Sequence, residues 1–287
     1  MKGYQYIVAK QTEWAKNNGI CLIGSKVTRG RRAYTTQLDD NLFQSLLPDV
    51  RKSVETGDGK ELGTSDLPGK MQAVHSSSAL GINVFQYWKS ISKVPTIATL
   101  CGFCRKGSDV SYDVRFEEKY SISNSFKRHP NIDVVIHNKP NAKIKRFAIE
   151  CKFSEAYGDH GHDGLKTDYL QLDEIWDDIP TLKTFAQKIS PDDKEFEHLH
   201  PAQLVKHILA MKRSFGRDGF RLLYLWYDVF GEQDKRHQDE IAKFARIAKK
   251  DKIKFHSLTY QELIVKLAKH CRSDHQEYIQ YLTERYL

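Results

Sequence analysis

Three charged residues lie on two short apolar segments of this 287-residue chain. Asp133 interrupts the apolar run 131–136, and Glu150 and Lys152 lie within the run 146–153. Burying a charge without a partner is costly, so charged groups on apolar segments are expected to bind one another or a ligand. Carboxylate oxygens are ligands for Mg²⁺, and a Lys ammonium binds phosphate. The pattern therefore predicts a site for a metal ion and a phosphate group.

The two segments are predicted to form a β-hairpin. Residues 131–136 and 146–153 are rich in β-branched and aromatic residues, and turn-forming residues occupy 138–141 between them. Side chains alternate along a strand, so Glu150 and Lys152 are expected to point to the same side. The alternate positions are expected to pack in the core: Phe147, Ile149, Cys151 and Phe153.

Asp133 followed by Glu150-Cys151-Lys152 resembles the signature of the PD-(D/E)XK nuclease superfamily, in which an Asp precedes Glu or Asp, any residue and Lys. The resemblance covers residues 112–153 well and the flanking elements more loosely. Asn131-Ile132 stands where a Pro often precedes the Asp, and that Pro is dispensable in the family. The resemblance implies an α/β fold with a mixed central sheet flanked by helices, which is the restriction-endonuclease-like αβββαβ core, with helical additions at both ends.

The resemblance also implies a Mg²⁺-dependent deoxyribonuclease, and Mn²⁺ is expected to substitute for Mg²⁺. Asp133, Glu150 and the backbone carbonyl of Cys151 are expected to hold the ion, which lowers the pKa of a bound water. Lys152 is expected to orient that water and to stabilise charge on the phosphorus. DNA is the expected partner. A restriction or defence endonuclease is favoured over a repair or junction-cleaving enzyme, although the fold serves all of these.

Glu118 is predicted as a further carboxylate of the metal site, either as a ligand or by positioning water. Residues 112–122 are predicted to form the strand before the hairpin, and Glu118 is the lone charge on its apolar face. That face otherwise consists of Val114, Phe116, Tyr120 and Ile122. The alternative interpretation is a Glu at a strand end that reaches water.

Gln203 is predicted to contact the site from a helix that begins at Pro201, a favoured first-turn residue. The resemblance implies this role, since family members often place a Gln or a basic residue on the helix behind the catalytic strands. His207, four residues later on the same flank, is interpreted as a surface histidine.

The helix predicted over 75–88 contains no Glu or Asp. Some members of the superfamily carry an acidic metal-site residue on the corresponding helix, so in this chain that position has either moved or is missing. A missing acid supports a second interpretation, a catalytically inactive nucleic-acid-binding module with the nuclease fold. A third interpretation is a protein-interaction domain whose basic faces contact an acidic partner.

The order of predicted elements divides the chain near residue 70. Helices are predicted over 4–16 and from Asp39 or Asp40 to Val50, followed by a long loop at 57–70. We therefore expect an N-terminal helical region at 1–70 and a nuclease-like domain at 71–287. Later in the chain we expect a helix from Pro201, a strand over 221–229, a helix over 238–249, a strand over 253–258 and helices over 261–269 and 276–286.

Composition is consistent with a globular protein that binds a polyanion. The hydrophobic fraction is 40%, the net charge is +8 and the pI is about 9.0. Basic side chains cluster at 28–32 and again at 243–254; each cluster is either a solvated surface or a contact to a nucleic-acid backbone.

The chain has no apolar run of about 18 residues, which argues against a membrane span. It also lacks an apolar signal segment, so a cytoplasmic protein with five reduced cysteines is expected. A homodimer is an open alternative, because cutting both strands of a duplex needs two sites.

Overall fold

The computed structural model describes residues 2–57, 61–64, 66–159, 161–271 and 273–287. Its centre is a five-stranded mixed sheet with the strand order β3-β4-β5-β8-β9. Strands β3, β4 and β5 form an antiparallel meander, and β5, β8 and β9 are parallel. The predicted fold class and hairpin are confirmed. The strands are β3 (Ser111–Lys119), β4 (Asn131–Asn138), β5 (Arg146–Lys152), β8 (Phe220–Trp226) and β9 (Phe255–Thr259).

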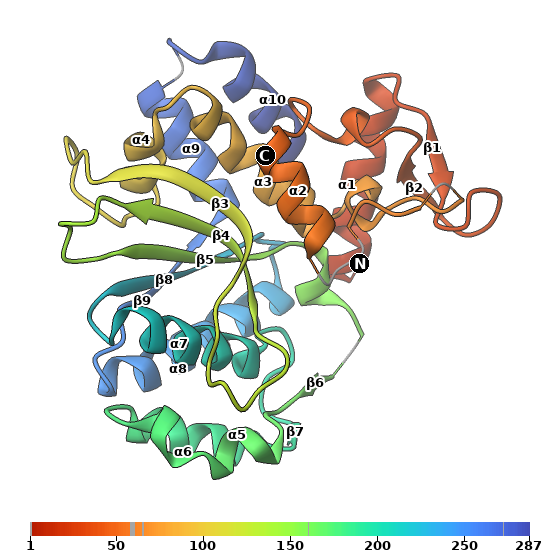
Figure 1. The fold of residues 1–287 in the computed structure, drawn as a ribbon. Helices are drawn as coiled ribbons and strands as arrows, with labels where there is room; N and C mark the ends of the chain where they lie inside the picture. Colours follow the sequence, from red (N-terminus) through yellow and green to blue (C-terminus); the bar gives the residue numbers. More distant parts are fainter. Residues whose placement is uncertain (1, 58–60, 65, 160, 272) are drawn as a thin grey trace.

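Helices cover both faces of this sheet (Figure 1). One core cluster joins the sheet to α3 (Ser77–Ser90), α4 (Val94–Leu100), α9 (Tyr260–Cys271) and α10 (Gln276–Tyr286). The opposite cluster joins it to α6 (Pro180–Lys188), α7 (Pro201–Phe215) and α8 (Glu232–Lys250). The apolar residues of β5 that were predicted to face the core belong to the first cluster. Charged side chains at the intervening positions of β5 therefore point toward α7.

The remaining elements complete the described chain. They are α1 (Gly3–Asn17), β1 (Leu22–Gly24), β2 (Arg32–Thr35), η1 (Asp39–Asn41), α2 (Pro48–Thr56), η2 (Lys70–Gln72), η3 (Ser154–Tyr157), β6 (His162–Asp163), α5 (Thr167–Gln171), η4 (Asp173–Trp176) and β7 (Asp192–Asp193). Elements labelled η are 3₁₀ helices. The described cysteines are all free thiols, and no described helix is long and apolar enough to cross a membrane.

The prediction of a helix from Asp39 or Asp40 to Val50 is wrong. The chain makes only the 3₁₀ turn η1 there, and α2 begins at Pro48. Side chains of α3 bind the intervening backbone instead: Asn83 accepts from the Phe43 N–H at 2.8 Å, and Gln86 accepts from the Leu47 N–H at 3.0 Å. These bonds satisfy backbone groups that a helix would have paired internally.

Arg285 on α10 links that helix to α1. Its side chain is only 1% exposed, and its Nε donates to Gln11 on α1 at 3.0 Å. Its guanidinium also donates to the Asn41 carbonyl at 2.9 Å and lies 4.1 Å from the ring centre of Trp14. A buried guanidinium requires such a full set of acceptors. Elements from the two ends of the described chain therefore pack together, while the division near residue 70 stays a prediction.

Candidate active site

The end of the β4–β5 hairpin brings Asp133 to β5. Pairing between the two strands ends at Val134 and Ile149, and Asp133 lies one residue beyond. The Oδ2 atom of Asp133 accepts a hydrogen bond from the Cys151 N–H at 2.7 Å. The Cys151 side chain lies in the core at 2% exposure. Asp133 is therefore fixed to the middle of the Glu150-Cys151-Lys152 segment.

Glu150 and Lys152 point to the same side of β5, as predicted. Lys152 Nζ lies 2.6 Å from Glu150 Oε1, and the two side chains are 13% and 1% exposed. The ammonium also donates to Gln203 Oε1 at 2.9 Å. Gln203 therefore contacts the predicted site from α7, while the ammonium is held between an amide and a carboxylate.

His207 is the second residue that α7 contributes. Its Nε2–H donates to Glu150 Oε2 at 2.6 Å, and its side chain is 1% exposed. The interpretation of His207 as a surface histidine is wrong. Residues four apart lie on one face of a helix, so Gln203 and His207 face β5 together and bind Lys152 and Glu150 respectively. This repeated spacing was the signal available in the sequence.

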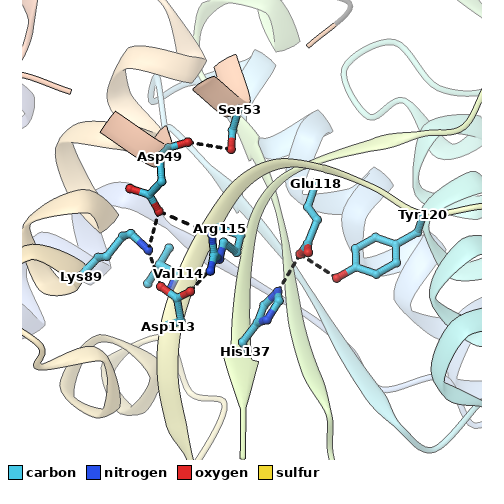
Figure 2. Close-up of polar contacts among 9 residues, drawn as sticks. All are labelled: Asp49, Ser53, Lys89, Asp113, Val114, Arg115, Glu118, Tyr120 and His137. Atoms are coloured by element: carbon cyan, nitrogen blue, oxygen red, sulfur yellow. Dashed lines mark hydrogen bonds and ion pairs between the residues drawn. The ribbon is translucent and has the colours of Figure 1, made fainter. Parts of the chain in front are cut away.

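The prediction that Glu118 shares a strand face with Val114 and Phe116 is also wrong. Its Oε2 accepts from His137 Nε2 at 2.8 Å and from the Tyr120 hydroxyl at 2.7 Å (Figure 2). Glu117 has a φ of +51°, which interrupts the alternation of side chains along β3. The structure therefore does not place Glu118 beside Asp133.

Glu117 occupies the place expected for Glu118. The register pairs Phe116 with Val134 and Glu118 with Ile132, so Glu117 falls opposite Asp133. Both carboxylates line a small cavity beneath α3. Helix α3 has no acidic residue, and the carboxyl groups that line this cavity therefore come from β3 and β4.

A family model described as "Restriction Endonuclease associating with ARP" (REase-ARP) matches residues 8–287. The chain belongs to the REase-ARP family. No curated protein and no solved structure matched it. Membership indicates a nuclease-like or defence role with DNA as the implied substrate, and the mixed sheet agrees with a restriction-endonuclease-like fold.

In this REase-ARP chain the Glu150–Lys152 pair is fully charged. Burial alone would raise the pKa of Glu150, but Lys152 and His207 lower it to about 2. Burial alone would lower the pKa of Lys152, but Glu150 and then Glu155 raise it above its ordinary value. The surroundings of Lys152 therefore favour its charged form, which suits charge stabilisation.

The two carboxyl groups beside this pair hold their protons more tightly than usual. Burial, then Glu150 and Glu117, raise the pKa of Asp133 well above its ordinary value. Burial, then Glu61 and Glu150, raise the pKa of Glu117 to about 7. Nearby carboxylates thus oppose ionisation of both groups, and for Asp133 the positive charge of Lys152 offsets this only in part.

A divalent cation fits this environment chemically. Carboxylate oxygens are the ligands that Mg²⁺ prefers, and a cation would relieve the repulsion among Glu117, Asp133 and Glu150. Within the described ranges, however, no three His, Cys, Asp or Glu side chains are grouped closely enough to form a metal site as they stand. Both oxygens of Glu150 already contact Lys152 and His207. Binding a cation would therefore require these side chains to rearrange.

Proposed function

We propose that this REase-ARP chain is a metal-dependent nuclease of the PD-(D/E)XK superfamily that hydrolyses phosphodiester bonds in DNA. The observation that carries the proposal is the contact of Asp133 with the Cys151 amide, which brings Asp133 to the Glu150–Lys152 pair at one strand end. Such an arrangement of two carboxylates and a Lys is what the sequence signature requires. Membership of a restriction-endonuclease family supports the same conclusion.

Asp133 and Glu150, with the backbone carbonyl of Cys151, are the proposed ligands of Mg²⁺ or Mn²⁺. Glu117 is proposed as the additional carboxylate in place of Glu118, because Glu117 lies opposite Asp133. When bound, the ion would polarise a phosphoryl oxygen and lower the pKa of a water.

Lys152 is proposed to orient the attacking water and to stabilise negative charge as it develops on the phosphoryl group. Its raised pKa keeps it protonated for this task. Gln203 and His207 act as positioning residues, because one fixes the ammonium of Lys152 and the other fixes the carboxylate of Glu150.

A cleavage assay tests the proposal. Wild-type protein is incubated with supercoiled, linear and branched DNA in Mg²⁺ or Mn²⁺, beside Asp133→Ala and Lys152→Ala. Matched controls are Asp109→Ala and Lys139→Ala, because these residues form an exposed ion pair (2.7 Å) near the other end of β4. We expect the controls to retain activity and the two site variants to lose about 10²-fold or more.

Equal cleavage by the wild type and both site variants would overturn the nuclease mechanism. DNA binding without cleavage or Mg²⁺ uptake would favour the inactive binding module instead. Failure to retard any DNA at any salt concentration would favour the protein-interaction domain. Sedimentation with and without DNA would test whether the chain forms a homodimer.

A further inference from the structure

The β1–β2 hairpin carries a concentrated positive charge. Every residue from 25 to 32 is exposed, and four of them are basic: Lys26, Arg29, Arg31 and Arg32. The sequence has no acidic residue between Glu13 and Asp39. The hairpin extends from the body of the molecule next to α1 (Figure 1). The hairpin is therefore an accessible basic surface without acidic residues of its own.

This charge is not neutralised within the part of the chain that the structure describes. None of the four basic side chains forms an ion pair there, whereas several basic side chains elsewhere do. Lys243, for example, contacts Glu195 at 2.6 Å, and Lys254 contacts Asp218 at 3.2 Å. Crowding like charges on a hairpin opposes folding, so a surface of this kind is suited to an anionic partner.

The turn of the hairpin has a defined shape. Gly24 and Val27 exchange backbone hydrogen bonds of 3.2 and 2.9 Å, and a Cβ on Gly24 would lie 2.1 Å from the Arg29 carbonyl oxygen. Val27 adopts a φ of +58°, and the residue is 46% exposed. A β-branched residue at positive φ is strained, so the surrounding contacts must hold this turn in place. The basic groups are thus presented on an ordered scaffold.

The base of the hairpin connects to the candidate active site. Val74 donates to the Ala33 carbonyl at 2.9 Å, and the Tyr34 and His75 rings meet edge to face at 6.3 Å. The His75 carbonyl in turn accepts from the Ser154 hydroxyl at 2.9 Å, two residues after Lys152. These contacts place the hairpin on the flank of the molecule where β5 ends.

We propose that the β1–β2 hairpin binds the sugar-phosphate backbone of duplex DNA beside the bond that is cleaved. This inference rests on the proposed nuclease function and extends it by naming a substrate-binding surface. A duplex is favoured because its closely spaced phosphates match a compact basic cluster, and because a two-stranded ribbon fits the major groove. Asp39 and Asp66 line the groove behind the turn, so the phosphates contact the outer basic side chains and not that groove.

The test compares two triple variants that remove equal charge. One is Arg29→Ala/Arg31→Ala/Arg32→Ala in the hairpin, and the control is Arg246→Ala/Lys249→Ala/Lys250→Ala. The control residues are also exposed and lie on α8. Binding to a 30-base-pair duplex is measured by fluorescence anisotropy in EDTA between about 50 and 200 mM salt, a range where counterion release is resolved. Circular dichroism confirms that both variants are folded.

We expect the hairpin variant to lose about 10-fold or more in affinity, and its plot of log K against log salt to become shallower by about 2.7, since each phosphate contact contributes about 0.9. The control is expected to change affinity by less than about two-fold, as for surface charges outside an interface. Unchanged affinity and slope in the hairpin variant, or a loss confined to the α8 variant, would overturn the inference. A loss of retention on an acidic protein column without a loss of DNA binding would also overturn it.

The two proposals fail in different ways. A wild type that cleaves DNA, with a hairpin variant that binds DNA equally well, would overturn the hairpin inference alone. A wild type that binds DNA through the hairpin but never cleaves it would overturn the nuclease proposal alone.

Discussion

The Nε2–H of His207 donates to Glu150 Oε2 at 2.6 Å, and both side chains are 1% exposed. Glu150 therefore has one oxygen fixed by α7 and the other beside Lys152. The proposed catalytic carboxylate depends for its position on a residue that would not itself touch the substrate.

Replacing His207 by Ala is expected to lower the cleavage rate about 10- to 100-fold, the usual effect of removing an outer-shell partner. It should also destabilise the fold by about 3–5 kcal/mol, because a buried charge loses a partner. His207→Gln, which keeps an N–H donor, should recover part of the rate. The Mg²⁺ concentration for half-maximal rate separates positioning from stability, and the exposed His270→Ala is the control. Full activity with unchanged Mg²⁺ dependence in His207→Ala would exclude the positioning role.

Glu117→Gln is expected to weaken Mg²⁺ binding and to reduce cleavage at least 10-fold, as for loss of a ligand or its support. Glu118→Gln, one residue away, should retain most activity, because Glu118 contacts His137 and Tyr120. Isothermal titration with Mg²⁺ and a cleavage assay distinguish the two. The reverse result, with activity lost only in Glu118→Gln, would restore the assignment predicted from the sequence.

The Mg²⁺ concentration that gives the half-maximal cleavage rate is expected to fall as pH rises from 6 to 8. Burial, Glu61 and Glu150 raise the pKa of Glu117 to about 7, so the group is mostly protonated below pH 7 and ionised above it. A cation must displace that proton at low pH, which costs affinity. Proton release on Mg²⁺ binding can be measured by calorimetry in buffers of different ionisation enthalpy. A pH-independent Mg²⁺ affinity would contradict this expectation.

Stability is expected to fall as pH drops below 6.5, in part because of His237. Burial, then the nearby His198, hold the pKa of His237 well below its ordinary value, and its ring binds Tyr224 at 2.9 Å. In the unfolded chain His237 binds a proton near pH 6.5, whereas in the folded chain it stays neutral. Each such group therefore lowers the free energy of unfolding by up to about 1.4 kcal/mol per pH unit as the pH falls. Urea unfolding at pH 7.5 and 5.5 should show a smaller difference for His237→Gln. Equal pH dependence in both proteins would rule out this contribution.

Arg285→Lys is expected to destabilise the protein by about 3–5 kcal/mol, because an ammonium cannot satisfy the same planar set of acceptors. Gln11 and the Asn41 carbonyl would lose their donor. Urea unfolding measures the loss, and Arg246→Lys on the exposed face of α8 is the control. A change of less than about 1 kcal/mol would show that packing, and not hydrogen bonding, holds these elements together.

Residues 131–138 and 146–152 show which features the sequence could predict. Apolar runs bounded by turn formers define strands, and alternation then places Glu150 and Lys152 together. The start of α2 differs from the prediction, which begins the helix at Asp39 or Asp40, although Pro48 is a favoured first-turn residue. Its true start also depended on Asn83 and Gln86 binding the preceding backbone, which is a tertiary effect.

The position of Glu117 could not be predicted from the sequence, and for His207 the spacing from Gln203 indicated the helix face but not the burial. A positive φ at a glutamate leaves no mark in the sequence, yet it decides which of two adjacent acids lies opposite Asp133. His207 is buried because Glu150 binds it, and that partner lies 57 positions earlier in the chain. Local patterns therefore defined the strand that carries the site, while long-range contacts selected the supporting residues.

The contact of Gln11 with Arg285 spans 274 positions of the sequence. At ribosomal rates of about 5–20 residues per second, α1 would emerge about 14–55 s before its polar partner is translated. Helix α1 therefore completes its packing long after it is translated, and until then its buried face would need to be shielded in the nascent chain.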